Sequence, residues 1–193
     1  MWTTIQIILG LLGLLLALAG DRLSIPIITY AGMVCLGLAA MAIGWEAILT
    51  RRIVLGRQRH GNVQTYSGLP AILQGVQFNL IGLFLIGVTF MVYSNADGRA
   101  VVLQMVRRPG LPLILFGALC LMQAAISIPG PHEMRQGPRW IVIMNLFVSR
   151  LLPGLILLGI GFGAMGLGLF EIIAPMAFDE MGGGFLEVLY GLR

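Results

Sequence analysis

The chain has 193 residues, of which 58% are hydrophobic and 10% are charged, whereas about 25% of the residues are charged in a typical soluble domain. Its net charge of +4 comes from 12 basic residues, all of them arginine, against 8 acidic ones. A nucleic-acid-binding domain gathers its basic residues on one exposed face. Here the arginines stand beside long apolar stretches, so we expect no nucleic-acid partner.

Five of these apolar stretches are long enough to cross a bilayer. A helix rises 1.5 Å per residue, so about 20 apolar residues cross about 30 Å of hydrocarbon. The sequence therefore predicts an all-α integral membrane protein, in which residues 1–193 form a single domain with about five transmembrane helices and one or two interfacial helices. The predicted spans cover residues 2–20, 25–49, 70–93, 110–129 and 151–170.

The first stretch has some features of a secretory signal, since Ala17-Leu18-Ala19 is similar to a cleavage site. A signal peptide also carries a basic region before its apolar core. No arginine or lysine precedes this run, so we expect it to be retained as a span.

Small residues recur at helical spacing within the first three spans. In lipid, helices gain little from hydrophobic burial against one another, so close backbone approach at small residues supplies the packing. Polar Asn79 falls on the stripe of the third span. The stripes consist of Gly10, Gly13, Ala17 and Gly20 in the first span, Gly37, Ala40 and Gly44 in the second, and Ala71, Gly75 and Gly82 in the third.

The loop 51–69 between the second and third spans is the most basic segment of the chain. It carries Arg51, Arg52, Arg57 and Arg59. Arginines beside the cytoplasmic interface act as positive-inside anchors and attract anionic headgroups by about 1 kcal/mol per charge. We expect these four residues to contact lipid headgroups, with docking of an acidic partner as the alternative.

Two further segments are apolar but do not fit simple crossings. Residues 97–108 are short and charged at both ends, and they are followed by Pro109-Gly110. This pattern predicts a helix lying in the outer interface. Residues 140–150 either lie in the cytoplasmic interface or extend the fifth span. We favour the interface, because Pro153 is best tolerated near a helix start.

The fifth span carries two glycine stripes on different sides of the helix. A helix that is smooth on both sides is suited to packing between two neighbours, and we expect that arrangement here. The first stripe comprises Gly154, Gly161 and Gly168, and the second comprises Gly159, Gly163 and Gly166.

Candidate sites for chemistry are few. Cys35 and Cys120 fall inside spans, where small packing residues are the expected use of free cysteine. His132-Glu133 is the nearest approach to a metal cluster, and two residues are too few for such a site. None of the spans carries an ionisable residue at its centre. We therefore predict no metal, no cofactor and no enzymatic activity.

These patterns favour a non-catalytic accessory, structural or assembly subunit of a larger integral-membrane complex. Its expected partners are the lipid bilayer and other integral-membrane subunits, with no evident small-molecule substrate. The alternative is a small multi-pass transporter or channel. Such a protein often has inverted repeats and broken helices with a polar lining, and the sequence shows no convincing repeat.

Loop arginines predict the orientation of the chain, because cytoplasmic loops are enriched in them. Five arginines would lie on the opposite side, together with most of the acidic residues. The expected location is the cytoplasmic (inner) membrane, with the N-terminus in the cytoplasm and the C-terminus outside. The seven arginines on the predicted cytoplasmic side are Arg51, Arg52, Arg57, Arg59, Arg135, Arg139 and Arg150.

Single cysteines introduced into a background without Cys35 and Cys120 test this topology. A membrane-impermeant thiol reagent added to intact cells should label Asp97→Cys and Glu180→Cys but leave Arg57→Cys unlabelled until the membrane is opened. Labelling of positions 57 and 97 from the same side would contradict the five-span threading.

Overall fold

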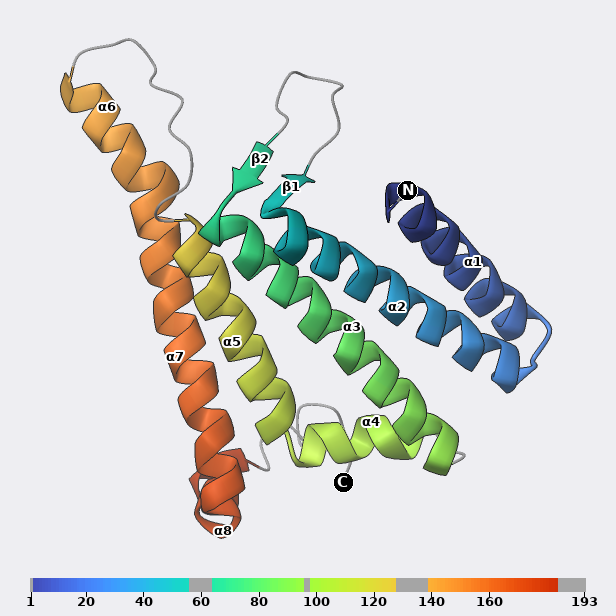
Figure 1. The fold of residues 1–193 in the computed structure, drawn as a ribbon. Coiled ribbons are helices and arrows are strands. Elements are labelled where there is room, and N and C mark those ends of the chain that lie inside the picture. Colours follow the sequence, from blue (N-terminus) through green and yellow to red (C-terminus); the bar gives the residue numbers. More distant parts are fainter. Residues whose placement is uncertain (1, 56–63, 96–97, 128–138, 184–193) are drawn as a thin grey trace. The chain divides into compact units, whose positions relative to one another are not determined.

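The computed structural model describes residues 2–55, 64–95, 98–127 and 139–183 (Figure 1). Among these residues helices dominate, and one short two-stranded ribbon accompanies them. In chain order the elements are α1 (Trp2–Arg22), α2 (Pro26–Thr50), β1 (Arg52–Leu55), β2 (Gln64–Ser67), α3 (Leu69–Asn95), α4 (Gly98–Arg107), α5 (Gly110–Ser127), α6 (Arg139–Leu146), the π-helical turn η2 (Phe147–Leu151), α7 (Leu152–Ile173), α8 (Pro175–Phe178) and the π-helical turn η3 (Asp179–Gly183).

Five of the described helices, α1, α2, α3, α5 and α7, are long and apolar enough to cross a membrane. They coincide with the five predicted stretches to within a few residues at each end, so the predicted helical bundle is confirmed. Their outward side chains are apolar as well: Leu15 is 64% exposed, Phe90 69% and Phe162 67%. A surface of this kind is unfavourable in water, and it indicates a multi-pass membrane protein.

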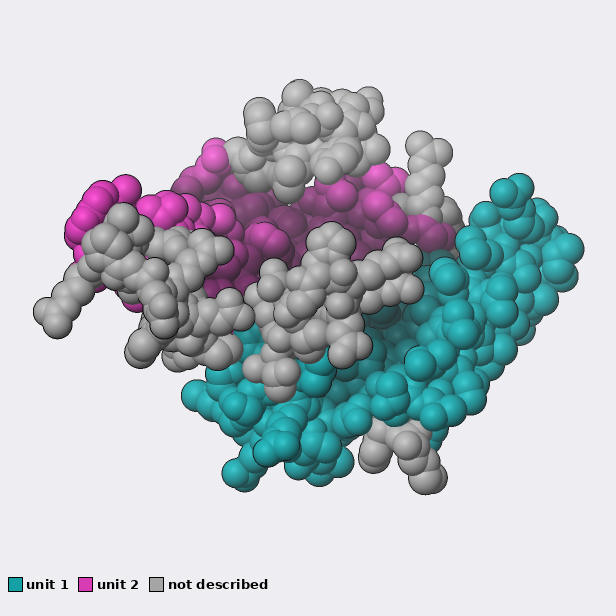
Figure 2. Space-filling model, turned by 90° about the horizontal axis from the view of Figure 1, so that it is seen from above, with its two compact units in different colours: residues 1–97 teal, residues 98–193 magenta. Residues whose placement is uncertain are grey.

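The chain divides into two compact units, Met1–Asp97 and Gly98–Arg193, which are coloured separately in Figure 2. Unit 1 holds α1, α2, α3 and the ribbon. Unit 2 holds the helices from α4 onward. Each unit is described by itself below.

In unit 1, α2 lies between α1 and α3 and packs along both (Figure 1). Gly32 of α2 faces α1, because a Cβ at this position would lie 2.3 Å from the backbone nitrogen of Ala17. Gly37 and Gly44 of α2 face α3. The helix with two smooth sides that is packed between two neighbours is therefore α2.

The loop predicted at 51–69 contains regular structure. β1 and β2 pair antiparallel, with Ile53 opposite Tyr66. Ile53 is buried against Ala47 and Ala71, where α2 and α3 meet the ribbon. Arg51 adopts a left-handed conformation (φ 51°) that turns the chain out of α2. The strands have four residues each, too few to show an alternating pattern in the sequence.

In unit 2, α6, η2 and α7 form one continuous helical rod beside the antiparallel α5 (Figure 1). Our preference for a separate interfacial helix at 140–150 is therefore wrong, and this segment extends the fifth span. Leu152, next to the proline, keeps helical backbone angles, and its N–H bonds to the carbonyl of Phe147. Pro153 has no N–H to donate and crowds the preceding turn. The wider π turn accommodates the ring, so the helix does not break.

Within the predicted segment 97–108, Gly98–Arg107 form α4, which ends two residues before Pro109. Its side chains divide between two faces, with Val101 buried and its neighbour Val102 59% exposed. The N–H of Leu113 bonds to the carbonyl of Pro109 at 2.8 Å, so α5 begins directly after the turn. The position of α4 at a membrane interface stays a prediction.

Candidate functional site

Two helices of unit 1, α2 and α3, approach closely at a pair of facing glycines. A Cβ on Gly44 would lie 2.5 Å from the carbonyl oxygen of Gly75, and a Cβ on Gly75 would lie 2.6 Å from the carbonyl oxygen of Gly44. Two turns away, Gly37 and Gly82 face one another in the same way, at 2.9 and 2.5 Å. No side chain larger than hydrogen fits at these positions without movement of the backbone.

Unit 2 contains the same arrangement between α5 and α7. A Cβ on Gly117 would lie 2.7 Å from the carbonyl oxygen of Gly161, and the reverse distance is 3.0 Å. Gly110 and Gly168 form the second pair, at 3.0 and 2.6 Å. The same register places fully buried Ala124 opposite Gly154, which is also buried.

We call each of these contacts a glycine seam: Gly37 and Gly44 with Gly82 and Gly75 in unit 1, and Gly110 and Gly117 with Gly168 and Gly161 in unit 2. Within each helix the paired glycines are seven residues apart, the spacing that keeps one seam facing a partner. The reciprocal approach of each glycine to a carbonyl oxygen is typical of Cα–H···O contacts between helices. The seam is thus an internal repeat, one copy per unit.

The two glycine stripes predicted on α7 have different surroundings. Gly154, Gly161 and Gly168 are buried, and the latter two pack against α5 in the seam. Gly159 and Gly163 are exposed, and among the described residues nothing lies within 4 Å of a Cβ built on either of them. Among the described residues, α5 therefore covers one side of α7 and leaves the side of Gly159 and Gly163 open.

Asn79 accompanies the seam of unit 1. Its side-chain amide lies against Gly44 and so contacts α2. The buried Oδ1 atom has no hydrogen-bond partner among the described residues. A second polar contact joins α1 to α2, where the Gln6 amide donates to the Glu46 carboxylate.

Unit 2 contains an ion pair that sequence reasoning missed. Glu171 lies on the last turn of α7 and is only 5% exposed. Arg108, two residues before α5, lies 3.4 Å from its Oε1 atom and 3.8 Å from Asp179 Oδ2. Glu171 also approaches Gly110 at the start of α5, where the positive end of the helix dipole favours a carboxylate.

The predicted headgroup contacts lie partly outside the described residues. Arg51 and Arg52 are exposed at the junction of α2 and β1. The Thr50 hydroxyl donates to the carbonyl of Arg52 at 3.0 Å and holds the backbone there. Arg57 and Arg59 fall in the range 56–63, outside the described residues.

Among the residues that the structure describes, no three His, Cys, Asp or Glu side chains gather into a group that could hold a metal ion. Cys35 and Cys120 are free thiols, and Cys120 is buried. The residues that the structure does bring together are glycines and a few polar pairs, so the candidate sites are helix contacts.

Comparison with known protein families, with characterised proteins and with solved structures finds no match to the chain.

Alanine substitutions of two glycines on neighbouring helices test the seam. Gly117→Ala should lower the free energy of unfolding by about 1–3 kcal/mol, because the methyl group forces α5 and α7 apart. Gly159→Ala should leave stability unchanged or raise it by up to about 1 kcal/mol, because this position is open and alanine favours helix. Unfolding of each variant in mild detergent, monitored by circular dichroism, measures both changes in stability. Equal effects of the two substitutions would refute the seam.

Removing the partner of Glu171 tests the buried ion pair. Arg108→Ala should destabilise the protein by about 1–2 kcal/mol, because the buried Glu171 carboxylate loses its charged partner. The loss is moderate because the arginine is half-exposed and water replaces part of its interaction. Adding Glu171→Gln to that variant should recover more than half of the loss. Asp179→Asn is the control and should cost less than about 0.5 kcal/mol. Additive effects of Arg108→Ala and Glu171→Gln would argue against coupling.

Proposed function

We propose that this protein is a non-catalytic, membrane-embedded subunit that associates with other integral-membrane proteins as an accessory, structural or assembly component. The observation that supports the proposal most is the open stripe of α7, which comprises Gly159, Gly163 and Gly166. All three glycines are exposed, and a Cβ on any of them would meet nothing within 4 Å among the described residues.

The open stripe has the form of a helix-docking surface. At 100° per residue it lies roughly opposite the buried glycines of α7. Exposed apolar side chains border it on both sides, among them Leu155 and Phe162 on one side and Ile156 and Leu167 on the other. A shallow apolar channel floored by glycine lets a second helix approach closely, and such packing drives helix association in lipid.

The glycine seams show how this chain forms such contacts internally. In both units, the backbone at glycines spaced seven residues apart contacts the backbone of an antiparallel helix. Gly159 and Gly166 repeat that spacing on the free side of α7. The proposed partner is therefore an apolar transmembrane helix with small residues of its own.

The proposed setting is the cytoplasmic membrane, with the N-terminus and the arginine-bearing ribbon on the cytoplasmic side. Arg51 and Arg52 are exposed next to apolar Leu49, which is 65% exposed. A positive side chain beside an apolar one fits the boundary between headgroups and acyl chains.

A small transporter or channel is the second candidate, and the repeated seam is the observation that favours it. Two antiparallel helix pairs with the same packing are compatible with an internally repeated architecture, which many transporters share. The pairs run in the same sense in the predicted topology, so the repeat would be parallel. The alternative predicts transport by the isolated chain.

Leucine substitution on the free side of α7 separates folding from association. Gly163→Leu should leave the unfolding temperature of the isolated protein within about 2 °C of the original, because the position is open. The same change should abolish co-purification of larger membrane proteins after gentle extraction, because leucine fills the channel. Gly87→Leu, at an equally open position on α3, is the matched control and should retain the partners.

A transport assay on the isolated chain in liposomes distinguishes the accessory subunit from the transporter. An accessory subunit should move no ions or small solutes. Saturable flux from the pure protein, together with unchanged migration of the Gly163→Leu variant in native gels, would favour the transporter.

A further inference from the structure

The turn between α1 and α2 carries a shallow, open pocket that the helix contacts do not explain. It has a volume of about 350 Å³ and is lined by Gly20, Asp21, Ser24, Pro26, Thr29 and Tyr30. This volume lies at the lower end of the range for small-ligand sites, roughly 300–1,000 Å³. The pocket belongs entirely to unit 1.

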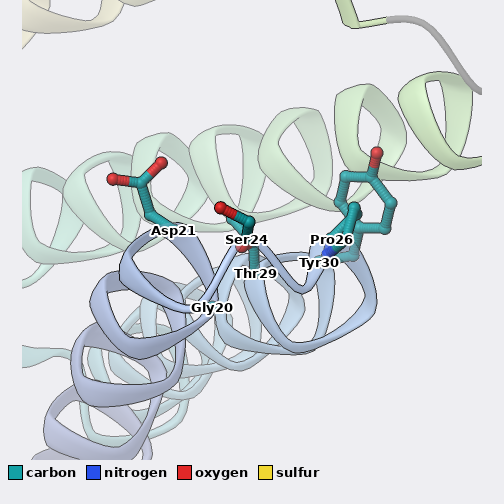
Figure 3. Close-up of a pocket in the computed structure, with 6 residues that line it drawn as sticks. All are labelled: Gly20, Asp21, Ser24, Pro26, Thr29 and Tyr30. Atoms are coloured by element: carbon teal, nitrogen blue, oxygen red, sulfur yellow. The ribbon is translucent and has the colours of Figure 1, made fainter.

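The polar side chains that line this pocket all carry oxygen atoms. Figure 3 shows the side chains of Asp21, Ser24 and Tyr30 rising on the same side of the turn. Asp21 is exposed and forms no ion pair within the described part of the chain. The Asp21 carboxylate only accepts hydrogen bonds, whereas the hydroxyls can both donate and accept, so a ligand that donates to Asp21 suits this lining.

Asp21 is the one charged side chain among the residues that line the pocket, and its carboxylate attracts a cation. The ligand that fits these groups is a cation with N–H donors.

The geometry is fixed by two close contacts. A Cβ at Gly20 would lie 2.4 Å from the backbone nitrogen of Thr29, so the helices meet tightly below the pocket. The ring of Tyr30 packs edge-on against Tyr93 of α3, with centroids 6.0 Å apart. The helices that carry the side chains lining the pocket are therefore held in place by packing.

Apolar side chains surround this polar pocket. Leu23 is 63% exposed, Ile25 40% and Ile27 64%, all within the same turn. A ligand with a cationic head and hydrocarbon chains would contact both surfaces at once.

We propose that the pocket binds the primary ammonium group of an ethanolamine phospholipid, with its acyl chains along Leu23, Ile25 and Ile27. A quaternary ammonium is the poorer ligand, because it has no N–H to donate and is normally held by several aromatic rings. Tyr30 is the one aromatic side chain among the residues lining the pocket. The inference rests on the proposed membrane setting but not on the role as an accessory subunit.

Native mass spectrometry of the full chain, loaded with equal amounts of phosphatidylethanolamine, phosphatidylcholine and phosphatidylglycerol of the same acyl chains, tests the site. The ethanolamine lipid should be retained at least about fivefold over the other two. Asp21→Asn should remove most of that preference, a loss of about fivefold, since a charge-assisted hydrogen bond is lost. Tyr30→Phe, which preserves the ring contact with Tyr93, should reduce it about threefold.

Glu180→Gln removes an exposed acidic charge from unit 2 and is the matched control, which should keep the preference. Circular dichroism of each variant verifies the fold, and Tyr30→Phe provides a second reading if Asp21→Asn unfolds. Equal retention of the ethanolamine and choline lipids, or an unchanged preference in both pocket variants, would overturn the proposal. Displacement of the lipid by free ethanolamine at millimolar concentration would also overturn the lipid assignment, because it would identify a soluble amine as the ligand. Failure of partner co-purification has no bearing on these outcomes, since the isolated chain is used.

Discussion

Direct contact between the backbones of neighbouring helices is the constraint on which the rest of this structure depends. The chain has few large buried side chains: within the described residues, Ile126 is the largest that is fully buried. Most of the buried positions in the long helices are glycine or alanine. The large apolar residues consequently point outward, as expected where the surroundings are themselves apolar and burial within the protein adds little. Stability here comes from dispersion and weak Cα–H···O contacts at short range.

That constraint explains which parts of the fold could be predicted from the sequence. The five long helices follow from length and hydropathy alone, because every backbone group in lipid must be satisfied within its own helix. The stripes of Gly75, Gly82, Gly161 and Gly168 are visible from helical periodicity. Which helix would face each stripe was not visible, since pairing depends on matching glycines 31 to 58 positions apart in the sequence.

The remaining differences have local physical causes. Pro153 would ordinarily mark a helix start, and only the π turn before it shows how the helix continues. The β1–β2 ribbon depends on burial of Ile53 against α2 and α3, a tertiary contact that no local pattern encodes. The pairing of Arg108 with Glu171 joins residues 63 positions apart, so composition alone could not reveal it. The pocket at the α1–α2 turn arises in the same way, from backbone geometry around Gly20 and Ser24.

The unbroken rod formed by α6, η2 and α7 has a consequence for how far the protein extends from a bilayer. Its three segments contain 8, 5 and 22 residues, which gives a length of about 52 Å at 1.5 Å per residue. A hydrocarbon layer of about 30 Å accommodates longer helices by tilting, but observed tilts reach only about 40°. Even at that tilt a rod of this length spans about 40 Å along the bilayer normal, so it is longer than the hydrocarbon layer and part of it reaches the level of the headgroups. Exposed Trp140 near the α6 end suits that level, because indole rings prefer the headgroup region.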